Sequence, residues 1–225
     1  MDSGFASLTL APRNDIMTNL HTAGHRRGVV CAPHSAAVED GRAILEEGGN
    51  AIEAMIAMAA SIAAVYPHMN HIGGDGFWLI REPNGKVRAI MSAGRAGAKA
   101  TPRFYRDAGH HEIPSRGPLA ALTVPGAVAG WMLAVEAAKA QTGQGINKGS
   151  SRLPLHVLLS AAIKRAREGY KVTRSQAALT REKYAELEPA PGFLNAFLID
   201  GKAPDEGAIL KQTAFPPRSI ISPKW

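Results

Sequence analysis

One segment constrains the fold of this chain more than any other. Residues 51–65 are almost entirely small and apolar, and Glu53 is their only charged residue. Because a helix that is apolar on every side must be buried, this segment predicts a central helix, packed closely against a sheet. The segment is shorter than the roughly 20 residues that span a bilayer. We therefore expect no membrane association and a soluble, cytoplasmic protein.

A glycine cluster and a β-hairpin follow this helix. The cluster reads Ile72-Gly-Gly-Asp-Gly-Phe77, and strands are predicted at residues 77–81 and 86–91. Asn84-Gly85 between them is a pair typical of tight hairpin turns. The glycines permit positive φ angles and close approach of the backbone where helix meets sheet.

The remaining pattern predicts an α+β or layered α/β fold, with strands and helices first and helices afterwards. We expect a short strand at residues 28–33 and a strand with a turn at 193–201. Hydrophobic spacing and capping residues predict four further helices, at residues 35–47, 128–140, 154–168 and 174–187. Residues 1–27 are expected to form a disordered leader, residues 141–152 an exposed loop, and residues 215–225 an irregular tail.

Charge and cysteine content exclude several classes of function. The net charge is +7, but Lys and Arg are scattered and are not interleaved with aromatic residues. We therefore expect no nucleic-acid partner. Cys31 is the only cysteine, so the chain forms no internal disulfide.

Three residue groups resemble chemical sites but have plainer interpretations. His68, His71 and Asp75 are candidate metal ligands, yet their spacing is loose and no helix frames them; polar residues bordering a turn explain them better. Cys31 with His34 is a candidate thiol–imidazole pair, but a buried packing cysteine is commoner. The glycine cluster lacks the lysine of a phosphate loop and precedes a strand instead of following one. No metal or cofactor site is therefore assigned.

Arg95 is the candidate binding residue. It lies in a loop of small residues, Ser92-Ala-Gly-Arg-Ala-Gly97, just beyond the second hairpin strand. An arginine with little bulk around it can offer a planar fork to a carboxylate. The alternative is an ordinary exposed arginine on a loop.

The motifs, taken in order, resemble those of the gamma-glutamyltranspeptidase family. The similar segments are residues 28–34, 43–51, 67–68, 72–77, 98–102, 123–126 and 153–169, and the resemblance extends to about residue 212. It implies a partial N-terminal-nucleophile hydrolase with an αββα sandwich. It also implies that residues 28–214 form an incomplete large-subunit-like domain with a helical segment. The resemblance fades within residues 214–225.

The family resemblance also implies a mechanism. A precursor cuts itself into a large and a small subunit, and the threonine freed at the start of the small subunit attacks an acyl group, with no separate cofactor. This chain corresponds to the large-subunit portion only, so we carry over no catalytic residue. The family's arginine for the substrate α-carboxylate falls at Ala93, and Arg95 is displaced by two positions. This arrangement is more similar to the transpeptidase-like branch that includes acylases.

Three hypotheses about function follow from the resemblance. The first is an incomplete enzyme whose family hydrolyses or transfers the acyl group of gamma-glutamyl or related amides such as glutathione. We expect this chain to be inactive alone. The second is a non-catalytic binding or assembly module that pairs with a separate small-subunit-like chain, because half of the sandwich is missing. The third is a degenerate remnant without a selected function.

Overall fold

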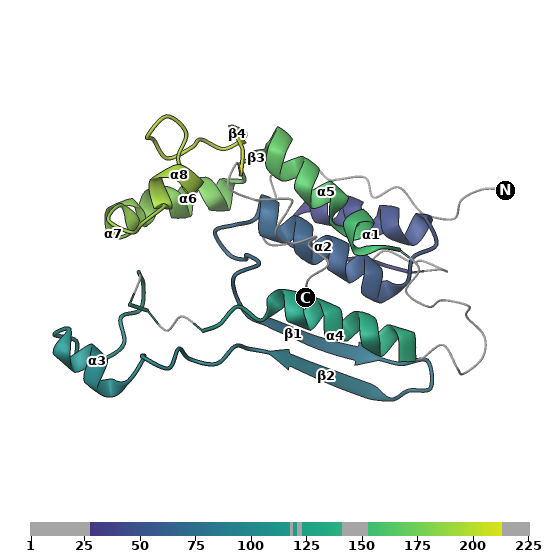
Figure 1. Cartoon of the computed structure of the whole chain (residues 1–225). Helices are drawn as coiled ribbons and strands as arrows, with labels where there is room; N and C mark the ends of the chain where they lie inside the picture. The colour runs from purple at the N-terminus through teal and green to yellow at the C-terminus, as the bar shows by residue number, and fades with distance from the viewer. Residues whose placement is uncertain (1–27, 118, 121–122, 141–152, 213–225) are drawn as a thin grey trace, which may run out of the picture.

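The computed structural model describes residues 28–117, 119–120, 123–140 and 153–212 (Figure 1). The predicted leader, the predicted loop at residues 141–152 and the predicted tail lie outside these residues. The elements in chain order are α1 (Ser35–Glu46), α2 (Ala51–Val65), β1 (Gly76–Arg81), β2 (Val87–Ser92), α3 (Pro102–Asp107), α4 (Ala127–Ala140), α5 (Leu155–Glu168), β3 (Tyr170–Lys171), α6 (Arg174–Glu182), α7 (Tyr184–Leu187), α8 (Phe193–Phe197) and β4 (Ile209–Leu210). The mixture of helices and antiparallel strands is an α+β fold.

Helix α2 is the centre of the main core, and its predicted burial is confirmed. Asn50 begins the helix: its side chain accepts hydrogen bonds from the backbone N–H groups of Ile52 and Glu53, and the Glu53 carboxylate accepts one from Asn50. Ile56 is fully buried against residues of α5 such as Leu158. Helices α1 and α5 make most of the contacts of α2, so helices, and not the expected sheet, provide its close packing.

A buried polar group ties these three helices together. Arg165 on α5 donates two hydrogen bonds to the Asp40 carboxylate on α1, at 2.9 and 2.8 Å. Ser61 on α2 donates a third to the same carboxylate. Asp40 and Ser61 are both buried. Because each charge is paired and hydrogen-bonded, this group is compatible with the core.

The hairpin is covered on one face only. β1 pairs antiparallel with β2, from Gly76 opposite Ser92 to Arg81 opposite Val87. The inner face packs on α4, and Ile80 on this face is buried. The opposite face, which we call the outer hairpin face, carries exposed apolar side chains: Phe77 is 70% exposed, Leu79 79%, Val87 54% and Met91 77%. The predicted tight turn is confirmed, with Gly85 at φ +87°.

An arm leaves the hairpin after β2 and returns before α4 (Figure 1). It carries α3, a short helix that falls in a region expected to be irregular. Thr101 accepts a hydrogen bond from the backbone N–H of Phe104, and Pro102 occupies the first helical turn. This threonine–proline pair is the signal that predicts a helix start, and it was visible in the sequence.

Near the C-terminal end of the described chain, one predicted helix is confirmed with a break, and one predicted strand is wrong. The expected single helix at residues 174–187 is interrupted at Lys183, which separates α6 from α7. The expected strand at residues 193–201 begins instead as helix α8. Phe193 and Phe197 are four residues apart, and the helix stacks their rings at 5.6 Å. Phe193 is also buried and packs edge-on against Tyr184 of α7, and this tertiary contact outweighs the preference of aromatic residues for strands.

The strand expected at residues 28–33 is also absent from the described chain, where residues 28–32 form no regular element. Val30 and Ala32 instead pack against the cluster of α1 and α2 residues formed by Ala37, Met58 and Ile62. A strand needs a neighbour to pair with its backbone, and the described residues place helices beside this segment. His34 then caps α1 by accepting a hydrogen bond from the Ala36 backbone N–H.

Candidate functional site

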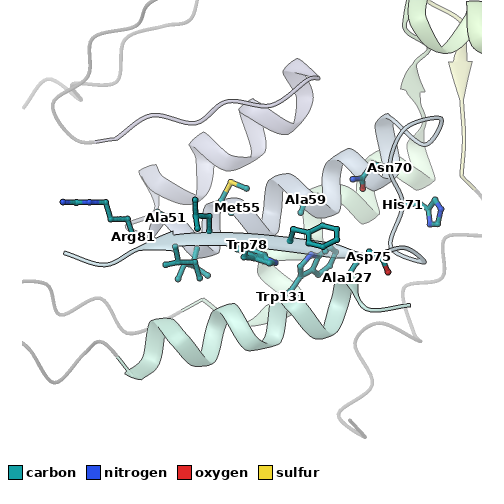
Figure 2. Close-up of a pocket in the computed structure, with 15 residues that line it drawn as sticks. Ala51, Met55, Ala59, Asn70, His71, Asp75, Trp78, Arg81, Ala127 and Trp131 are labelled. Carbon is teal, nitrogen blue, oxygen red and sulfur yellow. The ribbon is translucent and has the colours of Figure 1, made fainter. Parts of the chain in front are cut away.

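A cavity of about 500 Å³ lies between α2 and β1. Figure 2 shows Met55 of α2 on one side of β1 and Trp131 of α4 on the other. Phe77 and Leu79 contribute to its lining, so the cavity is continuous with the outer hairpin face. Its walls are mainly apolar, as in most small-molecule sites.

The cavity has two polar ends (Figure 2). Arg81 lies at one end, and Asn70, His71 and Asp75 lie at the other. The Nδ1 atom of His71 accepts a hydrogen bond from the Gly73 backbone N–H at 3.0 Å. A neutral imidazole has one donor and one acceptor nitrogen, so the ring proton of His71 is on Nε2. His71 therefore offers a hydrogen-bond donor at this end of the cavity.

Asp75 connects the glycine cluster to the arm. Its Oδ1 atom accepts hydrogen bonds from the Gly94 backbone N–H at 3.2 Å and from the Thr123 hydroxyl at 3.1 Å. Gly94 begins the arm and Thr123 ends it. One carboxylate oxygen thus holds both ends of the arm at the polar end of the cavity.

Backbone contacts at the same place are unusually close. Gly74 O accepts hydrogen bonds from the backbone N–H groups of Gly126 and Ala127, at 3.0 and 2.9 Å. A Cβ atom on Gly94 would lie 1.6 Å from Val124 O, so only glycine fits there. The expected close approach is confirmed, whereas no glycine between residues 72 and 77 uses the positive φ that glycine permits.

Arg95 follows Gly94 on this clamped part of the arm. Its backbone oxygen accepts a hydrogen bond from Val124 N–H at 2.9 Å, and Ala96 forms an isolated bridge with Thr123. The Arg95 side chain is exposed. It takes part in none of the ion pairs formed within the described residues. The role of Arg95 in binding a carboxylate stays a prediction, and the geometry leaves its guanidinium available for one.

The candidate metal ligands have other partners. Asp75 holds the arm, His71 Nδ1 is engaged by Gly73, and His68 Nε2 lies 3.3 Å from the Ser175 hydroxyl. Burial lowers the pKa of His68, and the nearby His34 lowers it further. No group of three His, Cys, Asp or Glu residues in the described ranges could hold a metal ion.

The other candidate sites are not assembled in this part of the chain. His34 Nδ1 caps α1, so this nitrogen is not directed at Cys31 as a base. Cys31 is exposed, so the expected buried packing is wrong as well. The glycine cluster presents Gly74 O to the start of α4, which is an acceptor and therefore unsuited to a phosphate. Among the helices described, none is long and apolar enough to cross a membrane.

Two contributors to the site were missed from the sequence. Asp75 was considered as a metal ligand and as part of a family motif, and Thr123 only as part of a family motif. Their contact joins residues 48 positions apart, so no local pattern reveals it. The usable signal was the position of Asp75 immediately before β1, beside the residues that follow β2.

Comparison with known proteins identifies similar sequences and structures. The profile of the family described as Gamma-glutamyltranspeptidase matches residues 37–216. The chain is 49% identical to the Oxamate amidohydrolase proenzyme of Klebsiella pneumoniae, over 83% of this chain and 34% of that protein. It is 36% identical to the Glutathione hydrolase-like YwrD proenzyme of Bacillus subtilis, over 80% of this chain and 32% of that protein. The chain thus spans about a third of the length of these relatives.

The fold has solved counterparts as well. The crystal structure of Helicobacter pylori gamma-glutamyltranspeptidase superposes with a TM-score of 0.72 at 29% identity, covering 86% of this chain and 53% of that one. Cephalosporin acylase from Bacillus halodurans superposes with a TM-score of 0.65 at 28% identity, covering 88% of this chain and 37% of that one. The described residues therefore form part of a gamma-glutamyltranspeptidase and acylase fold, as the α+β prediction required.

Proposed function

Because this chain belongs to the gamma-glutamyltranspeptidase family, we propose that it forms the large-subunit-like part of an amide-cleaving enzyme. The attacking threonine belongs to the remaining part, and this chain is inactive without it. The chain contributes the core helices, the hairpin and the binding arginine. The observation that carries this proposal is the outer hairpin face.

The outer hairpin face is the surface expected where a second layer is missing. Phe77, Leu79 and Met91 are each at least 70% exposed, side by side on paired strands. Burying apolar area stabilises a fold by roughly 25 cal/mol per Å². An exposed apolar sheet face continuous with a cavity therefore favours a covering layer. A second sheet packs about 10 Å from the first, as an αββα sandwich requires.

The substrate we propose is a small amide that carries a carboxylate. The relative with 49% identity is named for oxamate, whereas the relative with 36% identity is named for glutathione. Oxamate has a carboxylate directly beside its amide, and Arg95 can hold such a group through paired hydrogen bonds. Gamma-glutamyl amides, which also carry a carboxylate, are the second candidate.

The proposed reaction consumes one water for each amide. The threonine hydroxyl attacks the amide carbonyl while its own α-amine takes the hydroxyl proton. The C–N bond then breaks, the proton passes to the departing nitrogen, and ammonia leaves an acyl-enzyme ester. Water attacks this ester and releases the second carboxylate, which regenerates the threonine. From oxamate the products are oxalate and ammonium.

Reconstitution tests the proposal. The purified chain is assayed for ammonia release from oxamate, alone and together with the part of the Klebsiella relative that it does not cover. We expect no release above blank from the chain alone, and release from the mixture. Arg95→Ala should raise the KM of the mixture by about 10-fold, since a charged hydrogen bond is lost. Arg103→Ala, which removes an exposed arginine on α3, is the matched control.

Two outcomes would contradict the proposal. Turnover by the pure chain would show that it holds its own reactive group. The mixture could instead form a stable complex that releases no product from either oxamate or a chromogenic gamma-glutamyl anilide. That result would favour the alternative function, a non-catalytic assembly module. The same exposed outer face favours that candidate, because such a module needs a surface for its partner.

A further inference from the structure

We propose that Asp75 is a positioning residue for Arg95, acting by holding both ends of the arm on one carboxylate oxygen. The inference rests on the proposed carboxylate-binding role of Arg95 and deepens it. Asp75 itself does not touch the substrate. It determines where the Arg95 backbone lies relative to the polar end of the cavity.

The end of the hairpin ladder explains how one side chain reaches the arm. The last regular pair of the hairpin is Gly76 with Ser92. Beyond it, Asp75 and Gly94 no longer pair through their backbones in the ladder. The Asp75 Oδ1 atom instead accepts the Gly94 N–H. The carboxylate therefore continues the contact between the two strands by one further step, and Arg95 is the next residue.

The returning end of the arm meets the same oxygen. Thr123 donates its hydroxyl to Asp75 Oδ1, and the neighbouring Val124 donates its backbone N–H to Arg95 O. The arm between these ends is long, and each residue that becomes ordered loses conformational entropy. Two hydrogen bonds to one acceptor at the base keep the Arg95 segment in register while the rest of the arm extends away (Figure 1).

The charge of Asp75 and its hydrogen bonds should affect the binding of a carboxylate ligand in different ways. A negative carboxylate near Arg95 opposes the binding of an anion, so removing its charge alone should not weaken binding. Asp75→Asn keeps an oxygen that accepts both hydrogen bonds and removes the charge. Asp75→Ala removes both. A positioning role therefore requires the two variants to differ.

The experiment is a titration of the full 225-residue, ¹⁵N-labelled chain with oxamate, in which NMR measures binding at each step. Acetamide, which lacks the carboxylate, is the control ligand. We expect Asp75→Ala to weaken oxamate binding by about 10-fold, and Asp75→Asn to leave it within about 2-fold. Thr123→Val should weaken it by about 3-fold, and the conservative Thr123→Ser should restore it. Asp107→Ala, an exposed carboxylate on α3, controls for net charge.

A double variant separates positioning from general damage. If Asp75 acts through Arg95, adding Asp75→Ala to Arg95→Ala should change binding by less than about 2-fold. Hydrogen exchange of the Gly94 amide should accelerate in Asp75→Ala while the core amides of α2 stay protected.

The outcomes distinguish this inference from the proposal beneath it. If Arg95→Ala weakens binding but Asp75→Ala does not, positioning by Asp75 is wrong and the role of Arg95 stands. Equal weakening by Asp75→Ala and Asp75→Asn also overturns it, because keeping the hydrogen-bond acceptor then makes no difference to binding. If the wild-type chain and Arg95→Ala bind oxamate equally, or neither binds it, the carboxylate proposal fails and the inference fails with it.

Discussion

Two regions of this molecule bury their apolar residues to very different degrees. Helix α2 is enclosed by α1 and α5, and Ile56 at its centre is fully buried. The hairpin packs on α4 with its inner face, while Leu79 on its outer face is 79% exposed. The described helices therefore form a closed core, whereas the hairpin leaves one apolar face exposed. The buried face stabilises the chain, and the exposed face is the one to which we assign a covering layer in the proposed function.

The largest effect is expected in the helical region, at the buried ion pair. Arg165→Ala leaves the buried Asp40 carboxylate without its charged partner, which should lower the free energy of unfolding by about 3 kcal/mol. Arg42→Ala removes an exposed pair with Glu46 and should lower it by less than about 0.5 kcal/mol. Urea denaturation measures both. Equal losses would mean that the three helices do not depend on the buried group.

A neighbouring pair of variants compares the two faces of the hairpin. Ile80→Ala removes a side chain buried against α4 and should lower the free energy of unfolding by about 2 kcal/mol. Leu79→Ala, one residue away on the outer hairpin face, should change it by less than about 0.5 kcal/mol.

Leu79 should matter little for the stability of the isolated chain but more for association in the reconstituted mixture. If the proposed covering layer buries the outer hairpin face, Leu79→Ala should weaken association of this chain with the uncovered part of the Klebsiella relative. A large loss of stability in the isolated Leu79→Ala chain would indicate that this face is already covered by the chain itself.

The smallest expected effect is on the pH dependence of stability. It concerns His68, whose Nε2 atom lies 3.3 Å from the hydroxyl of Ser175 on α6. The folded state lowers the pKa of His68 through burial and through His34, so the unfolded chain binds the proton more readily. The contribution of His68 to stability is complete above its unfolded pKa of 6.5 and is lost as the pH falls from there toward the lower folded value. The melting temperature should therefore fall less between pH 8 and pH 5 in His68→Gln than in the wild type. An identical fall in both proteins would exclude His68 as the cause.

Local sequence patterns predicted the elements whose causes are local. The apolar composition of residues 51–65 and the Asn84-Gly85 turn depend on a few adjacent residues, and both predictions are confirmed. The position of Arg95 on a loop after β2 follows from the same reasoning. Predictions failed where packing decided the outcome. Phe193 suits a strand by propensity, yet it lies in a helix, buried against Tyr184 of α7.

What the sequence alone determined was the burial of α2, the hairpin and membership of a family through an ordered set of motifs, because each rests on neighbours in the chain. The tertiary structure decided which distant groups meet. Asp40 finds Arg165 across 125 positions, and Asp75 finds Thr123 across 48. Hydrogen bonds form only within about 3.5 Å, and only the packing of α1 and α5 on α2, or of the arm on the glycine cluster, brings such residues that close.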